Sequence, residues 1–160
     1  MQMRGQAQRR FAVHVKHVDE YQFSSQASED GRLHGEPFVS DEPDPVGKNA
    51  GPSTPALLGA AVGHCLSAAL LECLRHAHVE VLGCETEAVA VVAPNSEGLP
   101  RIDHVEVTLR PRLRELSSRK DRCEELFQRY CTVTSSVKKG IDVRVQVEWQ
   151  AEASARREQP

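Results

Sequence analysis

Aromatic side chains are scarce in this chain, and any excess of positive charge is lacking. Phe, Trp and Tyr make up 4% of the 160 residues. A chain of this length fits one domain with a core, but so few large side chains would leave a lone monomer only modestly stable. We therefore expect further burial across a dimer interface. The formal net charge of -3 indicates neither a nucleic-acid partner nor binding to an anionic membrane surface.

Long apolar runs and export signals are also lacking. The most apolar stretch, residues 56–74, is interrupted by His64 and Glu72, so we expect no segment that crosses a bilayer. The N-terminus is polar and basic and is followed by no apolar run. It is therefore not a secretory signal, and we expect a cytoplasmic protein.

Closely spaced cysteines are absent too. The chain has five cysteines at wide intervals, and an odd number so spaced is typical of neither a disulfide scaffold nor a zinc site. We expect no cofactor and no metal. Free cysteines are most often small buried hydrophobes, and we predict this for three of the five. The cysteines are Cys65, Cys73, Cys84, Cys123 and Cys131.

The apolar pattern predicts an α+β fold with antiparallel strands. We expect one domain at residues 11–149, a disordered start at 1–10 and a polar tail at 150–160. Alternating apolar residues and turn residues predict a long helix flanked by hairpins, and charged amphipathic segments follow. The strands are predicted at 11–18, from Tyr21 onward, briefly at 37–39, and at 79–93, 101–109 and 141–149; the helices are predicted at 55–78, 113–130 and 131–137.

A proline-rich loop precedes the long helix. Residues 41–55 contain four prolines and two glycines, which exclude regular structure there. Such a loop inside a small domain is usually functional. Its acidic residues, Asp41, Glu42 and Asp44, are more typical of a solvated loop than of a metal site, and the loop could instead cover a pocket as a lid.

The helix predicted at residues 55–78 is thin. Ser53 or Thr54 can cap it, and small residues alternate with leucine around most of its circumference, which is typical of a central helix packed closely against others. His64 precedes Cys65, and adjacent helical residues do not face each other. His64 is thus a poor general base for that thiol, and we expect it to be buried or to face a dimer partner.

Two motifs stand on either side of the long hairpin. A loop ending in Gly-Pro leads into GPSTPALLGAAVGHCLSAALL around Cys65, and FQRYCTVTSSV surrounds Cys131 before a last strand. Together they resemble the OsmC-like family, which includes the organic hydroperoxide resistance proteins. The resemblance covers roughly residues 10–149. It implies the OsmC-like fold, in which antiparallel sheets wrap around long central helices in an intertwined homodimer.

The resemblance also implies a reaction, the thiol-dependent reduction of organic hydroperoxides. By position, Cys65 matches the residue that attacks the peroxide and becomes a sulfenic acid, and Cys131 matches the residue that resolves it as a disulfide. A cellular dithiol would be the reductant. An arginine from the N-terminal strands steadies the thiolate in the family's peroxidases. Arg32 is the best candidate here, and the alternative is that Arg32 is a solvated residue of the hairpin turn. General thiol chemistry agrees, because oxidation follows thiolate character and access.

The chain departs from the family pattern near the start of the long helix. The peroxidases carry a glutamate nine or ten residues before the attacking cysteine, where this chain has Ala56 and Pro55. Thr132 stands where proline is frequent. An arginine without its carboxylate is held less well. The alternatives are a non-catalytic OsmC-like protein that binds a small apolar ligand in the dimer cleft or senses redox state, and a subunit that assembles with another protein.

Overall fold

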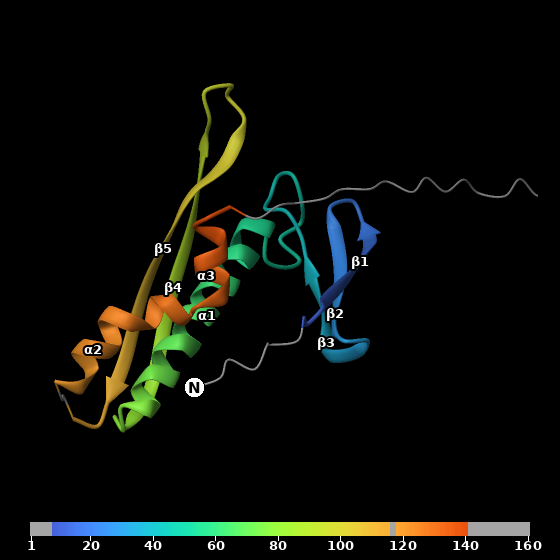
Figure 1. Ribbon diagram of the computed structural model, residues 1–160. Coiled ribbons are helices and arrows are strands. Elements are labelled where there is room, and N and C mark those ends of the chain that lie inside the picture. Colours follow the sequence, from blue (N-terminus) through green and yellow to red (C-terminus); the bar gives the residue numbers. More distant parts are fainter. Residues whose placement is uncertain (1–7, 116–117, 141–160) are drawn as a thin grey trace, which may run out of the picture.

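The computed structural model describes residues 8–115 and 118–140 as an α+β chain with antiparallel strands (Figure 1). Most of the predicted disordered start, the predicted strand at 141–149 and the predicted tail at 150–160 lie outside the described residues. The elements in chain order are β1 (Phe11–Asp19), β2 (Gln22–Glu29), β3 (Arg32–Ser40), α1 (Thr54–His76), β4 (Val81–Pro94), β5 (Pro100–Leu113), α2 (Arg119–Leu126), the 3-10 helix η1 (Phe127–Tyr130) and α3 (Thr132–Val137).

The first three strands form an antiparallel sheet in the order β1-β2-β3. The predicted turn after β2 is confirmed, because Asp30 and Gly31 take positive φ values of 48° and 83°, a conformation that glycine adopts readily. The prediction of only a short third strand was wrong. β3 has nine residues, since its hydrogen-bonded ladder with β2 reaches Ser40, opposite Phe23.

The predicted long helix is confirmed by α1, which packs closely on β4. Ser53 is its N-cap residue, although its side chain makes no capping hydrogen bond. A Cβ atom built on Gly63 would lie 3.1 Å from Ala88 Cβ, so only a residue without a side chain fits without a shift. Small residues thus bring the helix close to the sheet.

The second sheet is the long hairpin of β4 and β5. The Asn95 side chain accepts hydrogen bonds at 3.0 Å from the backbone N–H groups of Glu97 and Leu99 and so shapes the turn. β5 is longer than predicted, because Leu113 still pairs with Val81 at its end. The prediction of a single helix over residues 113–130 was therefore wrong: α2 begins only at Arg119 and gives way to η1.

One hydrophobic core lies between α1, the hairpin and the C-terminal helices. In Figure 1 the β1-β2-β3 sheet stands beside this body rather than on it. Among the described residues, that sheet supplies no member of the core cluster. The buried core residues are Val62, Leu66, Leu70, Leu74, Val79, Cys123, Phe127 and Cys131.

α1 is more apolar than we predicted from the sequence. By length and composition alone, it would suit a membrane-spanning helix despite His64 and Glu72, which corrects the expectation that no segment is long and apolar enough to cross a bilayer. Leu66, Leu70 and Leu74 are nevertheless buried in the core of this chain. Burial of these three leucines is typical of a helix in the core of a folded domain.

Candidate functional site

Cys65 and Cys131 come together where α1 meets α3. Cys65 lies within α1 and is half-buried, whereas Cys131 is the residue before α3 and is 1% exposed. The two thiols are close enough that each shifts the pKa of the other. Residues far apart in the sequence therefore share one site, as the family resemblance implied.

The surroundings of Cys131 favour its thiolate. Burial raises the pKa of the Cys131 thiol, but interactions with Cys65, with the Thr134 hydroxyl and with backbone N–H groups of α3 outweigh it, so the pKa is lowered. The Cys131 Sγ atom lies 3.0 Å from Thr134 Oγ1. Donors that can point at a sulfur anion stabilise it.

The pKa of Cys65 shifts in the opposite direction, upward. Burial, followed by the interaction with Cys131, raises the pKa of the Cys65 thiol, and backbone N–H groups of Val133 and Thr134 offset this only in part. The pKa values of the two thiols therefore shift in opposite directions, upward for Cys65 and downward for Cys131.

Arg32 lies at the first position of β3, in the exposed hairpin turn opposite Glu29. The largest influences on the pKa values of the two thiols are burial, each other and α3. Arg32 is not among them, so its role beside Cys65 stays a prediction. The first turn of α1 holds no acidic residue, as Pro55 and Ala56 require.

His64 is exposed in this chain. It borders an open hollow between α1 and β4 together with Ser67, whose hydroxyl lies 2.6 Å from Thr86 Oγ1. Cys84 also borders this hollow and is half-buried, so the prediction that it is a core residue was wrong. Cys123 was also predicted to be a core residue. It is 2% exposed, which confirms that prediction.

The acidic loop is organised by one of its own carboxylates. Asp41 is 3% exposed, which corrects the expectation of a solvated residue. It accepts hydrogen bonds from the backbone N–H groups of Glu42, Lys48 and Ala50 at 2.8, 3.0 and 3.1 Å. Burial raises the pKa of Asp41, but these donors outweigh it and lower the pKa. Over residues 8–115 and 118–140, no group of three or more His, Cys, Asp or Glu residues could hold a metal ion.

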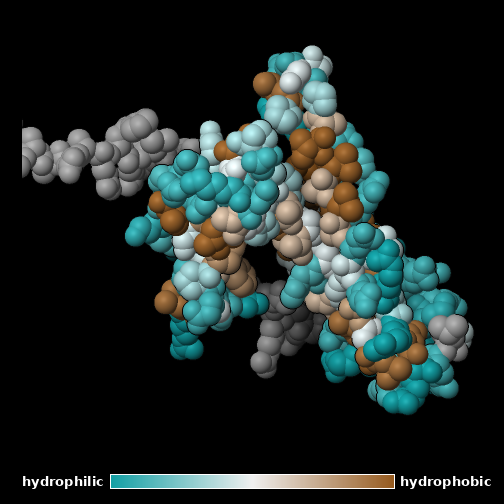
Figure 2. Space-filling view, turned by 180° about the vertical axis from the view of Figure 1, so that it is seen from behind, coloured by the Kyte–Doolittle hydropathy of each residue, from teal (hydrophilic) through white to brown (hydrophobic). Residues whose placement is uncertain are grey.

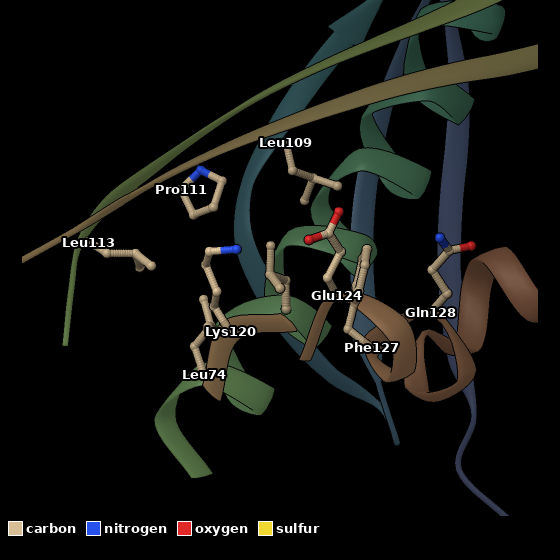
Figure 3. Close-up of a pocket in the computed structure, with 9 residues that line it drawn as sticks. Leu74, Leu109, Pro111, Leu113, Lys120, Glu124, Phe127 and Gln128 are labelled. Atoms are coloured by element: carbon tan, nitrogen blue, oxygen red, sulfur yellow. The ribbon is translucent and has the colours of Figure 1, made fainter. Parts of the chain in front are cut away.

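Two of the cavities in the described part of the chain border the core. The one drawn in Figure 3 has a volume of about 390 Å³ and lies between α1, α2 and β5, with Lys120 and Glu124 beside Leu109 and Phe127. The other, also about 390 Å³, includes Thr134, the partner of Cys131. The sequence analysis did not predict a role for Thr134 at the site. A hydroxyl three residues after a cysteine at a helix start is the spacing that could have indicated it.

These observations define a class: an α+β protein in which a central helix and a short C-terminal helix present a facing pair of thiols. A family model described as OsmC-like protein matches residues 47–146, which is more than half of the chain. The chain therefore belongs to the OsmC-like family. No curated protein matches its sequence closely.

Solved structures share the fold at low sequence identity. An OsmC-like protein of unknown function from Vibrio cholerae is 16% identical with a TM-score of 0.62, over 81% of this chain and 93% of that one. An OsmC-like protein from Mycoplasma pneumoniae is 11% identical with a TM-score of 0.63, over 81% and 87%. An organic hydroperoxide resistance protein from Elizabethkingia anophelis, with thiocyanate bound, is 15% identical with a TM-score of 0.54, over 83% and 89%.

Proposed function

We propose that this protein reduces organic hydroperoxides with the Cys65 and Cys131 thiols. The observation that carries the proposal is the contact of these two thiols between α1 and α3 in an OsmC-like fold. The name of the Elizabethkingia protein, an organic hydroperoxide resistance protein of the same fold, supports the choice of substrate.

Cys65 is the attacking residue because it is half-buried, whereas Cys131 is fully buried. The Cys65 thiolate attacks the terminal peroxide oxygen, the O–O bond breaks, and the alcohol leaves with a proton. Cys65 is then a sulfenic acid. The Cys131 sulfur attacks the Cys65 sulfur, the S–S bond forms, and the hydroxide leaves as water. A cellular dithiol reduces the disulfide by exchange.

Cys65 has to lose its proton before the attack, because the thiolate is the nucleophile. Burial and the Cys131 thiol raise the pKa of Cys65, so the site needs a positive group on the Cys65 side. We assign this role to Arg32. Arg32 belongs to a sheet that stands beside the core (Figure 1), and in the proposed homodimer the partner copy would bring this arginine to the site.

The apolar surfaces of the single chain support a homodimer. Phe11, Val13 and Val15 alternate along β1 and are 68%, 56% and 55% exposed. On the face shown in Figure 2, apolar side chains gather along the long hairpin, and a hollow separates it from the β1-β2-β3 sheet. Exposed apolar patches of this kind mark interaction sites. Analytical sedimentation at micromolar concentration should give a dimer; a monomer would contradict this part of the proposal.

The decisive experiment follows the consumption of cumene hydroperoxide with a dithiol as reductant. Wild type should turn over, with a preference for this bulky substrate over hydrogen peroxide. Cys65→Ser should not, since an alcohol is a far weaker nucleophile near neutral pH. Cys131→Ser should consume one equivalent and then stall as a trappable sulfenic acid or its overoxidised product. Equal, slow consumption by wild type and Cys65→Ser would refute the peroxidase.

One observation favours a second candidate function. The first turn of α1 lacks the carboxylate that holds the arginine in the family's peroxidases, and this would slow peroxide reduction. The second candidate is a non-catalytic protein that binds a small apolar ligand in the dimer cleft, with cysteines that are structural or sense redox state. It would replace the first if the experiment above shows no turnover that depends on Cys65.

A further inference from the structure

Four of the five cysteines lie at matching positions along one helix interface. Cys65 and Cys73 are eight residues apart on α1, and Cys123 and Cys131 are eight residues apart on the segments that pack against it. Cys131 contacts Cys65 at one end. At the other end Cys123 and Cys73 are close enough that their thiols interact. The interface therefore holds a second pair of thiols, Cys73 and Cys123, which takes no part in the proposed reduction of peroxide.

We propose that Cys73 and Cys123 form a second redox site, at which a small apolar disulfide is reduced while a disulfide bond forms between α1 and α2. Cys123 is 2% exposed, and Cys73 is partly buried against the core. The two thiols interact where α1 packs against α2, which places them as neighbours that an exchange reaction could join. The site does not depend on peroxide reduction at Cys65.

An apolar pocket gives access to one member of the pair. Its volume is about 490 Å³, and Cys73 lines it, whereas Cys123 does not. Glu72, which forms an ion pair with Arg75 and lies 2.9 Å from His76 Nε2, stands at the exposed side. A compact, uncharged disulfide suits this lining better than a charged one. The lining residues are Ala69, Glu72, Cys73, His76, Leu126 and Tyr130.

The pocket sets the order of the two exchange steps. The Cys73 thiolate attacks one sulfur of the external disulfide, whose S–S bond breaks, and one thiol leaves. Cys123 then loses its proton and attacks the Cys73 sulfur, and the second thiol leaves. Two protein thiols are oxidised and one disulfide is reduced to two thiols. Burial and the neighbouring Cys73 raise the pKa of Cys123 to about 11, so the second step should accelerate as the pH rises.

Separation along α1 keeps the two pairs independent. Eight residues of helix correspond to about 12 Å, which is too far for Cys73 to exchange directly with Cys65 in the same chain. Ala69 lies midway between them on α1, and buried Phe127 lies midway on the facing segment. A disulfide at one end therefore leaves the other pair free to react.

The test uses the full chain with Cys65, Cys84 and Cys131 all replaced by serine, so that only Cys73 and Cys123 remain. With 4,4′-dithiodipyridine as the oxidant, we expect two equivalents of thiopyridone per chain. Peptide mapping without reductant should recover Cys73 linked to Cys123. The same variant with Cys123→Ser is the matched control and should stop at one equivalent, with the aryl group held on Cys73.

A single equivalent from the three-serine variant, with a stable adduct on Cys73 and no linked peptide, would overturn the proposal. Wild type provides the second measurement if the variant does not fold. After treatment with the same oxidant, its digest should contain the Cys73–Cys123 peptide alongside Cys65–Cys131. Recovery of Cys65–Cys131 alone would also overturn it.

Discussion

The two ends of the α1 interface carry the same side chains in different surroundings. At the end near α3, Cys131 precedes a helix, and the Cys65 thiol, followed by the hydroxyl and N–H groups of Thr134, lowers its pKa against the effect of burial. At the end near α2, Cys123 lies inside a helix, where burial raises its pKa to about 11. The two ends thus differ in whether neighbouring groups outweigh burial, which raises the pKa of both thiols.

The largest expected difference between the two thiol pairs is in the rate of hydroperoxide consumption. Cys65→Ser should lower the consumption of cumene hydroperoxide by at least about a hundredfold, because the nucleophile is lost. Cys73→Ser, the matched substitution on the same helix, should stay within about twofold of wild type, because it changes no group at the reacting pair. Steady-state assays with a dithiol reductant give both numbers. A comparable loss in Cys73→Ser would mean that the two ends are not independent.

The stability of the protein at alkaline pH should depend on the ionisation of the buried Cys123 thiol. A thiol whose folded pKa lies above its unfolded value stabilises the fold below the unfolded pKa, and this contribution is lost as the pH rises through the folded pKa. For Cys123 that window runs from its ordinary value of 9.0 to about 11. Over it, the free energy of unfolding should fall by about 2 kcal/mol more in wild type than in Cys123→Val. Urea unfolding at several pH values measures this, and parallel curves would contradict the assignment.

The α3 end should respond to loss of a single hydroxyl. Thr134→Val removes the Oγ1 atom that lies 3.0 Å from Cys131 Sγ while keeping the shape of the side chain. The pKa of Cys131 should rise, and the thiolate fraction should fall by roughly fivefold, as loss of about 1 kcal/mol of hydrogen bonding implies. Thiolate absorbance during a pH titration detects it. Thr132→Val, at an exposed position, is the control and should leave the titration unchanged.

The smallest effect concerns the helix that both ends share. Gly63→Ala places a Cβ 3.1 Å from Ala88 Cβ, whereas at Gly59 the closest atom, Ala88 O, is 3.5 Å away. Both substitutions gain helix propensity of up to about 1 kcal/mol. Gly59→Ala should therefore be stabilising, and Gly63→Ala should lose most of that gain to the contact. Thermal unfolding compares them; equal melting temperatures would show that α1 is free to shift on β4.

Local pattern predicted much of the fold. Small residues and leucines indicated the helix that is now α1, and the turns after β2 and β4 fall at the predicted residues. The boundary between β5 and α2 could not be predicted, because Leu113 suits a helix as well as a strand and only its pairing with Val81 decides. Burial of Asp41 likewise depends on donors brought to it by a folded loop.

The sequence by itself determined the element types, the thin apolar helix and the family, and through the family it matched Cys65 with Cys131. Those features depend on periodicity and motif, which are properties of neighbouring residues. Only the tertiary structure decided that Cys73 faces Cys123, that Thr134 stabilises the Cys131 thiolate, and that the β1-β2-β3 sheet stands beside the core. Contacts between residues far apart in the chain depend on how helices and strands pack, and periodicity does not specify that packing.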